Sequence, residues 1–90
     1  YAVSKAGIIG LTKYLATYWA EKNIRVNCIT MGGVFDNQEM GFVQKYSKRV
    51  PMGKMAQKDD VCGALLYLAS QASSYVTGQN IIIDGGLTAW

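Results

Sequence analysis

Tyr1 and Lys5, at the start of the chain, are the residues whose types and spacing could do chemistry. Four positions apart on a helix, they would share one face, and a tyrosine held beside an ammonium group can act as a general acid or base. A phenol has an unperturbed pKa of about 10, so a neighbouring cation must favour the phenolate if the group is to work at neutral pH. The segment YAVSK therefore indicates either a catalytic proton donor or an ordinary first helical turn.

A second pair with the same spacing shows that the spacing alone identifies nothing. Tyr18 and Lys22 are also four residues apart, near the end of the same predicted helix. Tyr18 continues an apolar stripe, and Lys22 falls in the last turn, where the helix dipole favours a cation. The second pair has a sufficient structural explanation, so the role of the first depends on the segments downstream of it.

The composition is that of a core-rich globular chain that lacks the residues several chemistries need. Of its ninety residues, 50% are hydrophobic and 17% are charged, and the formal net charge is +3. The basic residues are scattered apart from Lys45, Lys48 and Arg49, which predicts a solvated helix face and no nucleic-acid partner. The absence of histidine excludes serine–histidine triads and histidine metal sites within this chain, and no metal site is expected.

Cysteine usage and hydropathy indicate the compartment. Cys28 and Cys62 lie in apolar surroundings without CxxC spacing, which is typical of buried free thiols in a reducing compartment. No apolar run approaches the roughly 18 residues needed to span a bilayer, and no signal-like segment is recognisable. We therefore expect a cytoplasmic protein without a membrane partner.

Periodicity and turn residues predict five elements. Asp36 and Glu39 form a capping-box pattern, so the second helix is expected to begin near Asn37. Strands joined through helices are parallel, and a parallel sheet is normally covered by helices on both faces. Two strands alone would leave edges and faces uncovered, so the predicted fold is α/β, the C-terminal portion of a doubly wound parallel sheet and an incomplete domain. The elements are a helix at 2–21, a strand at 24–29, helices at 37–49 and 58–69, and a strand at 79–84.

Four segments in a fixed order give the chain a resemblance to a known family. YAVSK, RVNCITMGGV, VPMGKMAQKDDVCGALLYLAS and SSYVTGQNIIIDGG resemble the C-terminal part of the short-chain dehydrogenase/reductase family, from Tyr1 to about Gly86. The resemblance implies a Rossmann-type sheet, with residues 1–90 as the C-terminal fragment of one NAD(P)-binding domain. The family's glycine-rich loop, its selector of NAD or NADP, its catalytic serine and its helix asparagine all precede the tyrosine, and none is in this sequence.

The resemblance also implies roles for five residues. Tyr1 matches the family's general acid/base, and Lys5 matches the lysine that holds the nicotinamide ribose and favours the phenolate. Met31, Gly32 and Val34 match the strand-end loop whose backbone groups hold the nicotinamide carboxamide. That loop reads Pro-Gly and then an aliphatic residue in the family, and methionine replaces the proline here. The implied cofactor is NAD or NADP.

Three further residues are expected to be structural. Family members often have a threonine that contacts the cofactor where Asp36 stands, but a carboxylate would repel the pyrophosphate, so Asp36 is expected to cap a helix. Gly85 and Gly86 could be mistaken for a phosphate-binding loop, but no helix is expected after them to supply amide groups.

The resemblance implies an NAD(P)-dependent oxidoreductase that interconverts a small-molecule alcohol and a carbonyl by hydride transfer, as a homodimer or homotetramer. The ninety residues alone are expected to be inactive. The alternative is a non-catalytic oligomerisation or regulatory module derived from the same fold. Residues 35–50 are expected to line the substrate pocket, and their segment FDNQEMGFVQKY resembles dehydrogenases of bacterial surface-sugar and flagellin-glycan pathways. A sugar-related substrate is therefore a further alternative.

Overall fold

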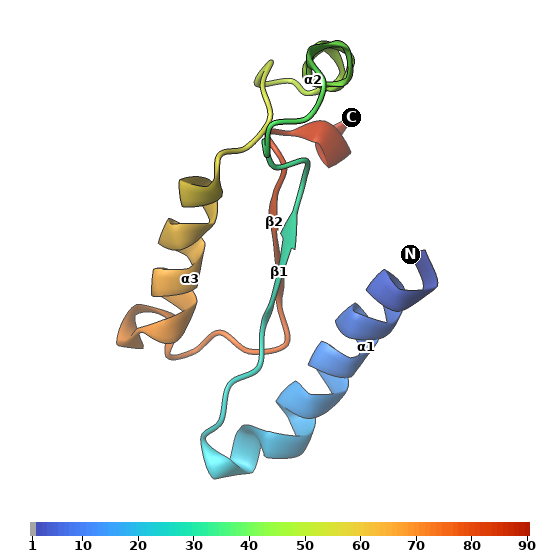
Figure 1. The fold of residues 1–90 in the computed structure, drawn as a ribbon. Coiled ribbons are helices and arrows are strands. Elements are labelled where there is room, and N and C mark those ends of the chain that lie inside the picture. The colour runs from blue at the N-terminus through green and yellow to red at the C-terminus, as the bar shows by residue number, and fades with distance from the viewer. Residues whose placement is uncertain (1) are drawn as a thin grey trace. The chain divides into compact units, whose positions relative to one another are not determined.

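The computed structural model describes residues 2–90, with side chains from Val3 onward, and Figure 1 shows the course of the chain. Two compact units are present, one of residues 2–29 with 64–81 and one of residues 30–63 with 82–90. Each unit contains one end of the two strands that pair in the sheet, β1 (Cys28–Met31) and β2 (Asn80–Ile83).

The two strands are parallel, as predicted. The amide of Cys28 donates to the carbonyl of Gln79, and the amide of Gly32 donates to the carbonyl of Ile83, each at 2.8 Å. The second strand lies within the predicted range of 79–84, but the first begins four residues later than the predicted start at 24.

Side-chain hydrogen bonds and one backbone bond, from the amide of Gly78 to the carbonyl of Val26 at 2.7 Å, hold the residues before β1 without a regular strand ladder. The amide of Val26 donates to Oγ1 of Thr77 at 3.1 Å, and Nδ2 of Asn27 donates to the carbonyl of Val76 at 3.0 Å. The Asn27 side chain also accepts from the amide of Gln79 at 3.0 Å. The predicted strand at 24–29 is therefore wrong in its first half, because regular backbone pairing starts only at Cys28.

The long helix of the first unit, α1 (Ala2–Trp19), confirms the helix predicted at 2–21. It continues as a 3-10 turn over Ala20–Lys22 and ends at Asn23, whose φ of 60° is left-handed. Among the side chains described in α1, Thr12 and Ala16 are buried. The predicted apolar stripe is exposed within this chain, as seen at Ile8, Leu11 and Tyr18.

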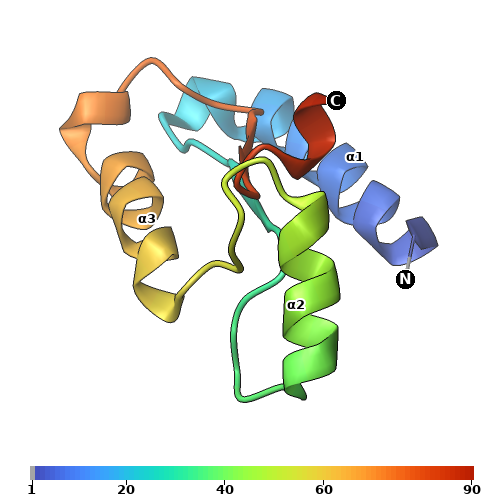
Figure 2. The same ribbon diagram turned by 90° about the horizontal axis from the view of Figure 1, so that it is seen from above.

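The third predicted helix, at 58–69, is present in two parts. Lys58–Val61 forms a 3-10 turn, in which a carboxylate oxygen of Asp60 accepts from the amide of Gln57 at 2.7 Å, and α3 (Cys62–Ala69) follows. Within the first unit, α1 and most of α3 lie on opposite sides of the strands (Figures 1 and 2). Cys28 is buried as expected, but Cys62, the first residue of α3, is exposed, so the expectation of a buried thiol is wrong for Cys62.

The helix α2 (Met40–Arg49) begins three residues later than predicted. Asn37 has a left-handed φ of 59°, a conformation that does not continue into a helix, and Glu39 precedes the first helical residue. Asp36 caps no helix: its carboxylate pairs with Nζ of Lys58 at 3.4 Å, and its amide donates to Oε1 of Gln38 at 2.7 Å. The predicted capping role of Asp36 is therefore wrong.

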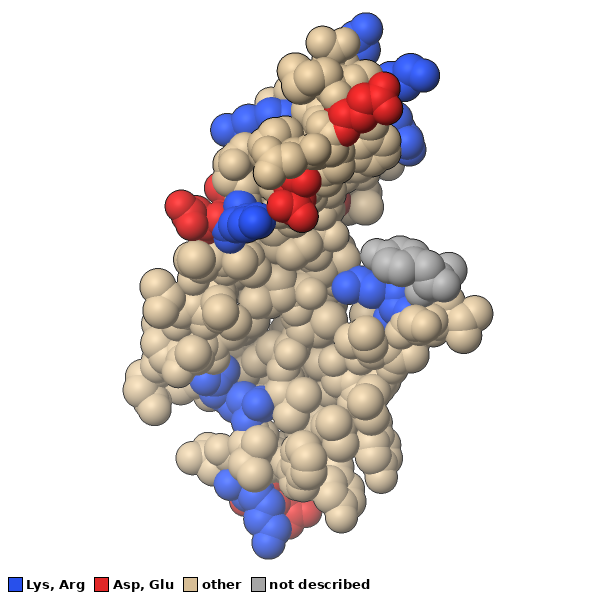
Figure 3. Space-filling view, in the orientation of Figure 1, with Lys and Arg blue, Asp and Glu red and all other residues tan. Residues whose placement is uncertain are grey.

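The surface around α2 carries charges of both signs. Figure 3 shows acidic and basic side chains interspersed over this end of the molecule rather than one basic stripe. Lys45, Lys48 and Arg49 are all exposed, as expected for a solvated helix face. In residues 2–90 no helix combines the length and apolarity needed to cross a membrane. The same range contains no cluster of three or more His, Cys, Asp or Glu residues that could hold a metal ion.

The carboxylate of Asp84 organises the end of the chain. One oxygen accepts from the amide of Gly86 at 2.9 Å, and the other accepts from the hydroxyl of Thr88 at 2.6 Å and its amide at 3.0 Å. A 3-10 turn follows at Leu87–Ala89, so the expectation that nothing helical comes after the two glycines is corrected. These amides already have an acceptor, which leaves them unavailable to a phosphate.

Replacing Thr88 with valine is expected to raise the pKa of Asp84 toward its ordinary value. The Thr88 hydroxyl is the main cause of the lowered pKa of Asp84, and backbone amides add to it. Because the folded-state pKa is the lower one, the stabilisation is present above about pH 4 and is lost as the pH falls through the folded pKa. Titration of the carboxyl ¹³C resonance measures the shift.

The matched control is Thr17→Val, which removes a hydroxyl that donates to the carbonyl of Tyr14 at 2.8 Å in α1. This variant should leave the pKa of Asp84 unchanged. An unchanged titration in Thr88→Val would contradict the prediction.

Candidate active site

A glycine turn, residues 31–34, follows β1 at the edge of the sheet where ligands usually bind. In open α/β sheets, ligands lie beyond the carboxyl ends of the parallel strands. Met31 is the last residue of β1, and the amide of Gly32 is bonded to Ile83 at the end of β2. The predicted cofactor residues Met31, Gly32 and Val34 are thus together in the second unit, at the carboxyl ends of both strands.

A short bridge to Ala56 fixes one side of the glycine turn. The amide of Ala56 donates to the carbonyl of Gly33 at 2.9 Å, and the carbonyl of Ala56 accepts from the amide of Phe35 at 2.8 Å. These two bonds make a parallel bridge between Val34 and Ala56. In such a bridge the amide and carbonyl of Val34 itself point away from Ala56.

The backbone of Val34 consequently offers an unused donor. Its carbonyl accepts from Nε2 of Gln38 at 2.9 Å. Its amide makes no hydrogen bond to any residue in the range 2–90. Val34 as a whole is half-buried within this chain. The turn can therefore donate one hydrogen bond to a carbonyl oxygen of a bound molecule.

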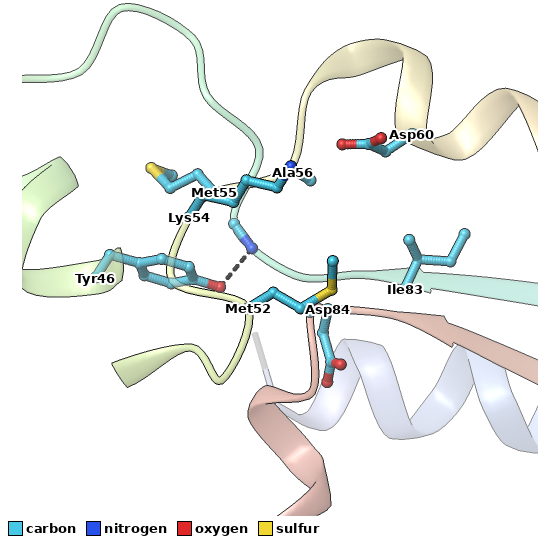
Figure 4. Close-up of a pocket in the computed structure, with 10 residues that line it drawn as sticks. Tyr46, Met52, Lys54, Met55, Ala56, Asp60, Ile83 and Asp84 are labelled. Carbon is cyan, nitrogen blue, oxygen red and sulfur yellow. Dashed lines mark hydrogen bonds between the residues drawn. The ribbon is translucent and has the colours of Figure 1, made fainter. Parts of the chain in front are cut away.

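Tyr46 on α2 is a contact of the glycine turn that the sequence alone did not reveal. Its hydroxyl accepts from the amide of Gly33, the dashed line in Figure 4. A Cβ atom at Gly33 would lie 2.5 Å from Cζ of Tyr46, and one at Gly32 would lie 2.9 Å from Cβ of Asp84. Glycine is required at both positions because the ring and the end of β2 approach the backbone this closely.

The only signal for Tyr46 in the sequence is its spacing from Phe42. The two aromatic residues are four apart on α2, and their ring centroids are 6.1 Å apart. Such a pair is common on helices and does not indicate what it packs against. The contact with Gly33 joins residues thirteen positions apart and depends on the loop between them.

Beside the turn lies a pocket of about 210 Å³, contained within the second unit. Figure 4 shows Tyr46 on one side of it, Lys54 and Met55 on another, and Met52 near the end of β2. Two acidic side chains line the pocket. Asp84 is hydrogen-bonded to Gly86 and Thr88 near the end of the chain, whereas Asp60 is not. The pocket is thus mainly apolar, with one cation, Lys54, and two carboxylates, Asp60 and Asp84, in its lining.

The predicted catalytic pair is described only in part. Lys5 lies in the first turns of α1 in the first unit, with its side chain half-buried. Tyr1 lies outside the described residues. The structure therefore brings together the three predicted residues of the glycine turn, and the roles of Tyr1 and Lys5 stay predictions.

Comparison with known proteins shows what the chain is similar to. A family model described as enoyl-(acyl carrier protein) reductase matches residues 1–88. The 3-oxoacyl-(acyl-carrier-protein) reductase FabG of Chlamydia pneumoniae is 45% identical over 94 residues, covering 98% of this chain and 37% of the reductase. Post-translational flagellin modification protein A of Campylobacter coli is 43% identical over 86 residues, covering 96% of this chain and 34% of that protein.

A solved structure is more similar still. A short chain dehydrogenase from Leptospira borgpetersenii serovar Hardjo-bovis, with bound NAD+, is 53% identical and has a TM-score of 0.95. The match covers 98% of this chain and 35% of the dehydrogenase. The chain thus spans about a third of the length of the relatives it matches.

Proposed function

Because the chain belongs to the short-chain dehydrogenase/reductase family, we propose that it is the proton-transfer and nicotinamide-binding end of an NAD(P)-dependent oxidoreductase. The whole enzyme would interconvert an alcohol and a carbonyl, and residues 1–90 would be the C-terminal part of its single Rossmann-type domain. The bound NAD+ in the Leptospira relative supports the cofactor class. The choice between NAD and NADP belongs to a segment outside this sequence.

The unused amide of Val34 is the observation that carries the proposal. It lies in the glycine turn, at the carboxyl ends of the parallel strands, and faces away from the Ala56 bridge. A nicotinamide carboxamide presents a carbonyl oxygen that suits this donor. Backbone donors need no particular side chain, which explains why Met31 can replace proline without removing the contact.

Each residue of the site then has a part in the reaction. A bound nicotinamide supplies or accepts the hydride. Tyr1 gives a proton to the carbonyl oxygen of the substrate during reduction and takes it from the alcohol during oxidation. Lys5 favours the phenolate of Tyr1 and holds the ribose, while Val34 orients the carboxamide.

For the substrate we propose a sugar-related alcohol or carbonyl. The segment that begins at Phe35 supports this class through its resemblance to dehydrogenases of surface-sugar and flagellin-glycan pathways. Residues 35–50 would line the substrate pocket, and the enzyme would act as a homodimer or homotetramer. Lys45, Lys48 and Arg49 are exposed on α2, as expected for a solvated helix face, so we assign them no substrate phosphate. Comparing turnover on neutral and phosphorylated sugars separates the two cases.

We expect the intact enzyme, meaning the full-length protein that carries this chain, to bind NADH saturably, and residues 1–90 alone to neither bind it tightly nor turn over. Pyrophosphate binding in this fold depends on a glycine-rich turn of the first strand and helix, which this sequence does not contain. A fluorescence titration with NADH measures both.

The two outcomes bear on different statements. Intact enzyme that binds neither NADH nor NADPH would contradict the dehydrogenase proposal. Tight, saturable binding by the isolated residues 1–90 would contradict only the statement that they are insufficient.

A further inference from the structure

The hydrogen bond between Tyr46 and Gly33 joins α2 to the glycine turn. Tyr46 lies in the second half of α2 (Met40–Arg49), and its side chain is half-buried. Its hydroxyl accepts from the amide of Gly33, and its ring fills the space that a side chain at position 33 would take. Both residues belong to the second unit.

The backbone of Gly33 is more flexible than that of most residues, so hydrogen bonds are needed to fix its conformation. A glycine has no Cβ to restrict φ and ψ, so a turn with two adjacent glycines has several accessible conformations. The residue before them is Met31, which does not lock its own φ as proline would. Hydrogen bonds therefore have to define the path of the turn.

Two hydrogen bonds hold the two peptide planes that flank Cα of Gly33. The carbonyl of Gly33 accepts from the amide of Ala56 at 2.9 Å, and this carbonyl shares one planar peptide with the amide of Val34. The amide of Gly33 lies in the preceding peptide, which Tyr46 holds. With both planes held, φ and ψ of Gly33 are determined, and the Val34 amide points in one direction.

We propose that Tyr46 is a positioning residue for the nicotinamide site: its hydroxyl fixes the peptide of Gly33 and thereby aims the amide of Val34. This inference rests on the proposed function, since the carboxamide is the group that the Val34 amide would bind. Tyr46 itself touches neither cofactor nor substrate in this role. Its loss should therefore weaken binding of the nicotinamide end of the cofactor only.

The test is Tyr46→Phe in the intact enzyme, which keeps the ring against Gly33 and removes only the acceptor. The dissociation constant for NADH should rise about threefold to tenfold, as expected for one lost hydrogen bond. The dissociation constant for ADP-ribose, which has no nicotinamide, should stay the same. Tyr75→Phe is the matched control, because Tyr75 is fully exposed and losing its hydroxyl should affect neither ligand.

A merely structural role for Tyr46 would give a different pattern. Equal weakening of NADH and ADP-ribose, or no change in either, would overturn the inference. Wild-type enzyme that binds ADP-ribose but not NADH would remove the proposed function, and the inference with it.

Amide hydrogen exchange provides a test that does not require the variant to fold. In the wild-type enzyme without cofactor, the Gly33 amide should exchange slowly, as the amide of Gly32 does because it is bonded to Ile83. Rapid exchange of Gly33 beside slow exchange of Gly32 would overturn the inference. In Tyr46→Phe, only the protection of Gly33 should be lost.

Discussion

Replacing Tyr1 with phenylalanine in the intact enzyme is expected to lower kcat by about a hundredfold to ten-thousandfold, the range that a positioned general acid or base contributes. The phenyl ring keeps the shape of the side chain and removes the proton that must reach the substrate oxygen. Binding of NADH should change little, because the glycine turn and Lys5 are unaltered. Steady-state kinetics together with an NADH titration separate the two quantities.

The chain supplies its own matched control for Tyr1. Tyr18 in α1 stands four residues before Lys22, which lies in the 3-10 turn that follows. Its side chain is 62% exposed, and its ring stacks on Tyr14 at a centroid distance of 5.9 Å. Tyr18→Phe keeps this stacking and should retain full activity. Comparable losses in the two variants, or an active Tyr1→Phe enzyme, would contradict the assignment of Tyr1.

Replacing Arg25 with methionine is expected to lower the free energy of unfolding by about 2–4 kcal/mol, because hydrogen bonds to a charged group are the stronger kind. The guanidinium donates to the carbonyl of Leu68 at 2.8 Å and to the hydroxyl of Ser73 at 2.9 Å. It also donates to the carbonyls of Val76 at 3.2 Å and Ser70 at 3.3 Å. One side chain thus satisfies acceptors at the end of α3 and in the connection to β2.

Methionine would cover much of the same apolar surface but would remove the charged donor from these acceptors. The carbonyl of Val76 would keep the side-chain amide of Asn27, and the carbonyls of Leu68 and Ser70 would keep the hydroxyl of Ser73. Ser73 is fully buried, so water cannot easily replace the lost partner of its hydroxyl. Urea unfolding of the intact enzyme should show a lower midpoint with an unchanged slope. Arg25→Lys should recover only part of the loss, because an ammonium group cannot reproduce the planar fork of a guanidinium.

The control for Arg25 is Arg49→Met, at the exposed end of α2. This change should alter stability by less than about 0.5 kcal/mol, as is usual for exposed positions. A loss of similar size in both variants would show that charge alone, and not the Arg25 contacts, is responsible.

The long helices were predictable because their signals are local. The apolar periodicity of α1 and the acidic first turn before α3 fall within single segments, and both helices are present where predicted. The glycine turn was predictable for the same reason, since two glycines directly follow a β-branched run. The family resemblance added what the residues alone could not: the nicotinamide role that we propose for that turn.

The errors arose where side chains bond to distant backbone. Gln38 binds the backbone on both sides of Phe35, which holds residues 34–38 in a turn and delays the start of α2. Asn27 and Arg25 bond to residues more than forty positions away, so the segment before β1 is extended without being a strand. The local sequence does not reveal these contacts. It shows only a capping-box pattern at residues 36–39 and a β-branched run at residues 24–29.

Because Tyr46 lies so close to Gly33, the residue at one of these positions limits which residues fit at the other. A side chain at 33 and an aromatic ring at 46 would occupy the same space, since Cβ and Cζ would be 2.5 Å apart. In a homologue with a larger residue at 33, we therefore expect either a different residue at 46 or a tyrosine ring that lies elsewhere. If the glycine turn is transplanted between dehydrogenases of this family, α2 should therefore be transplanted with it.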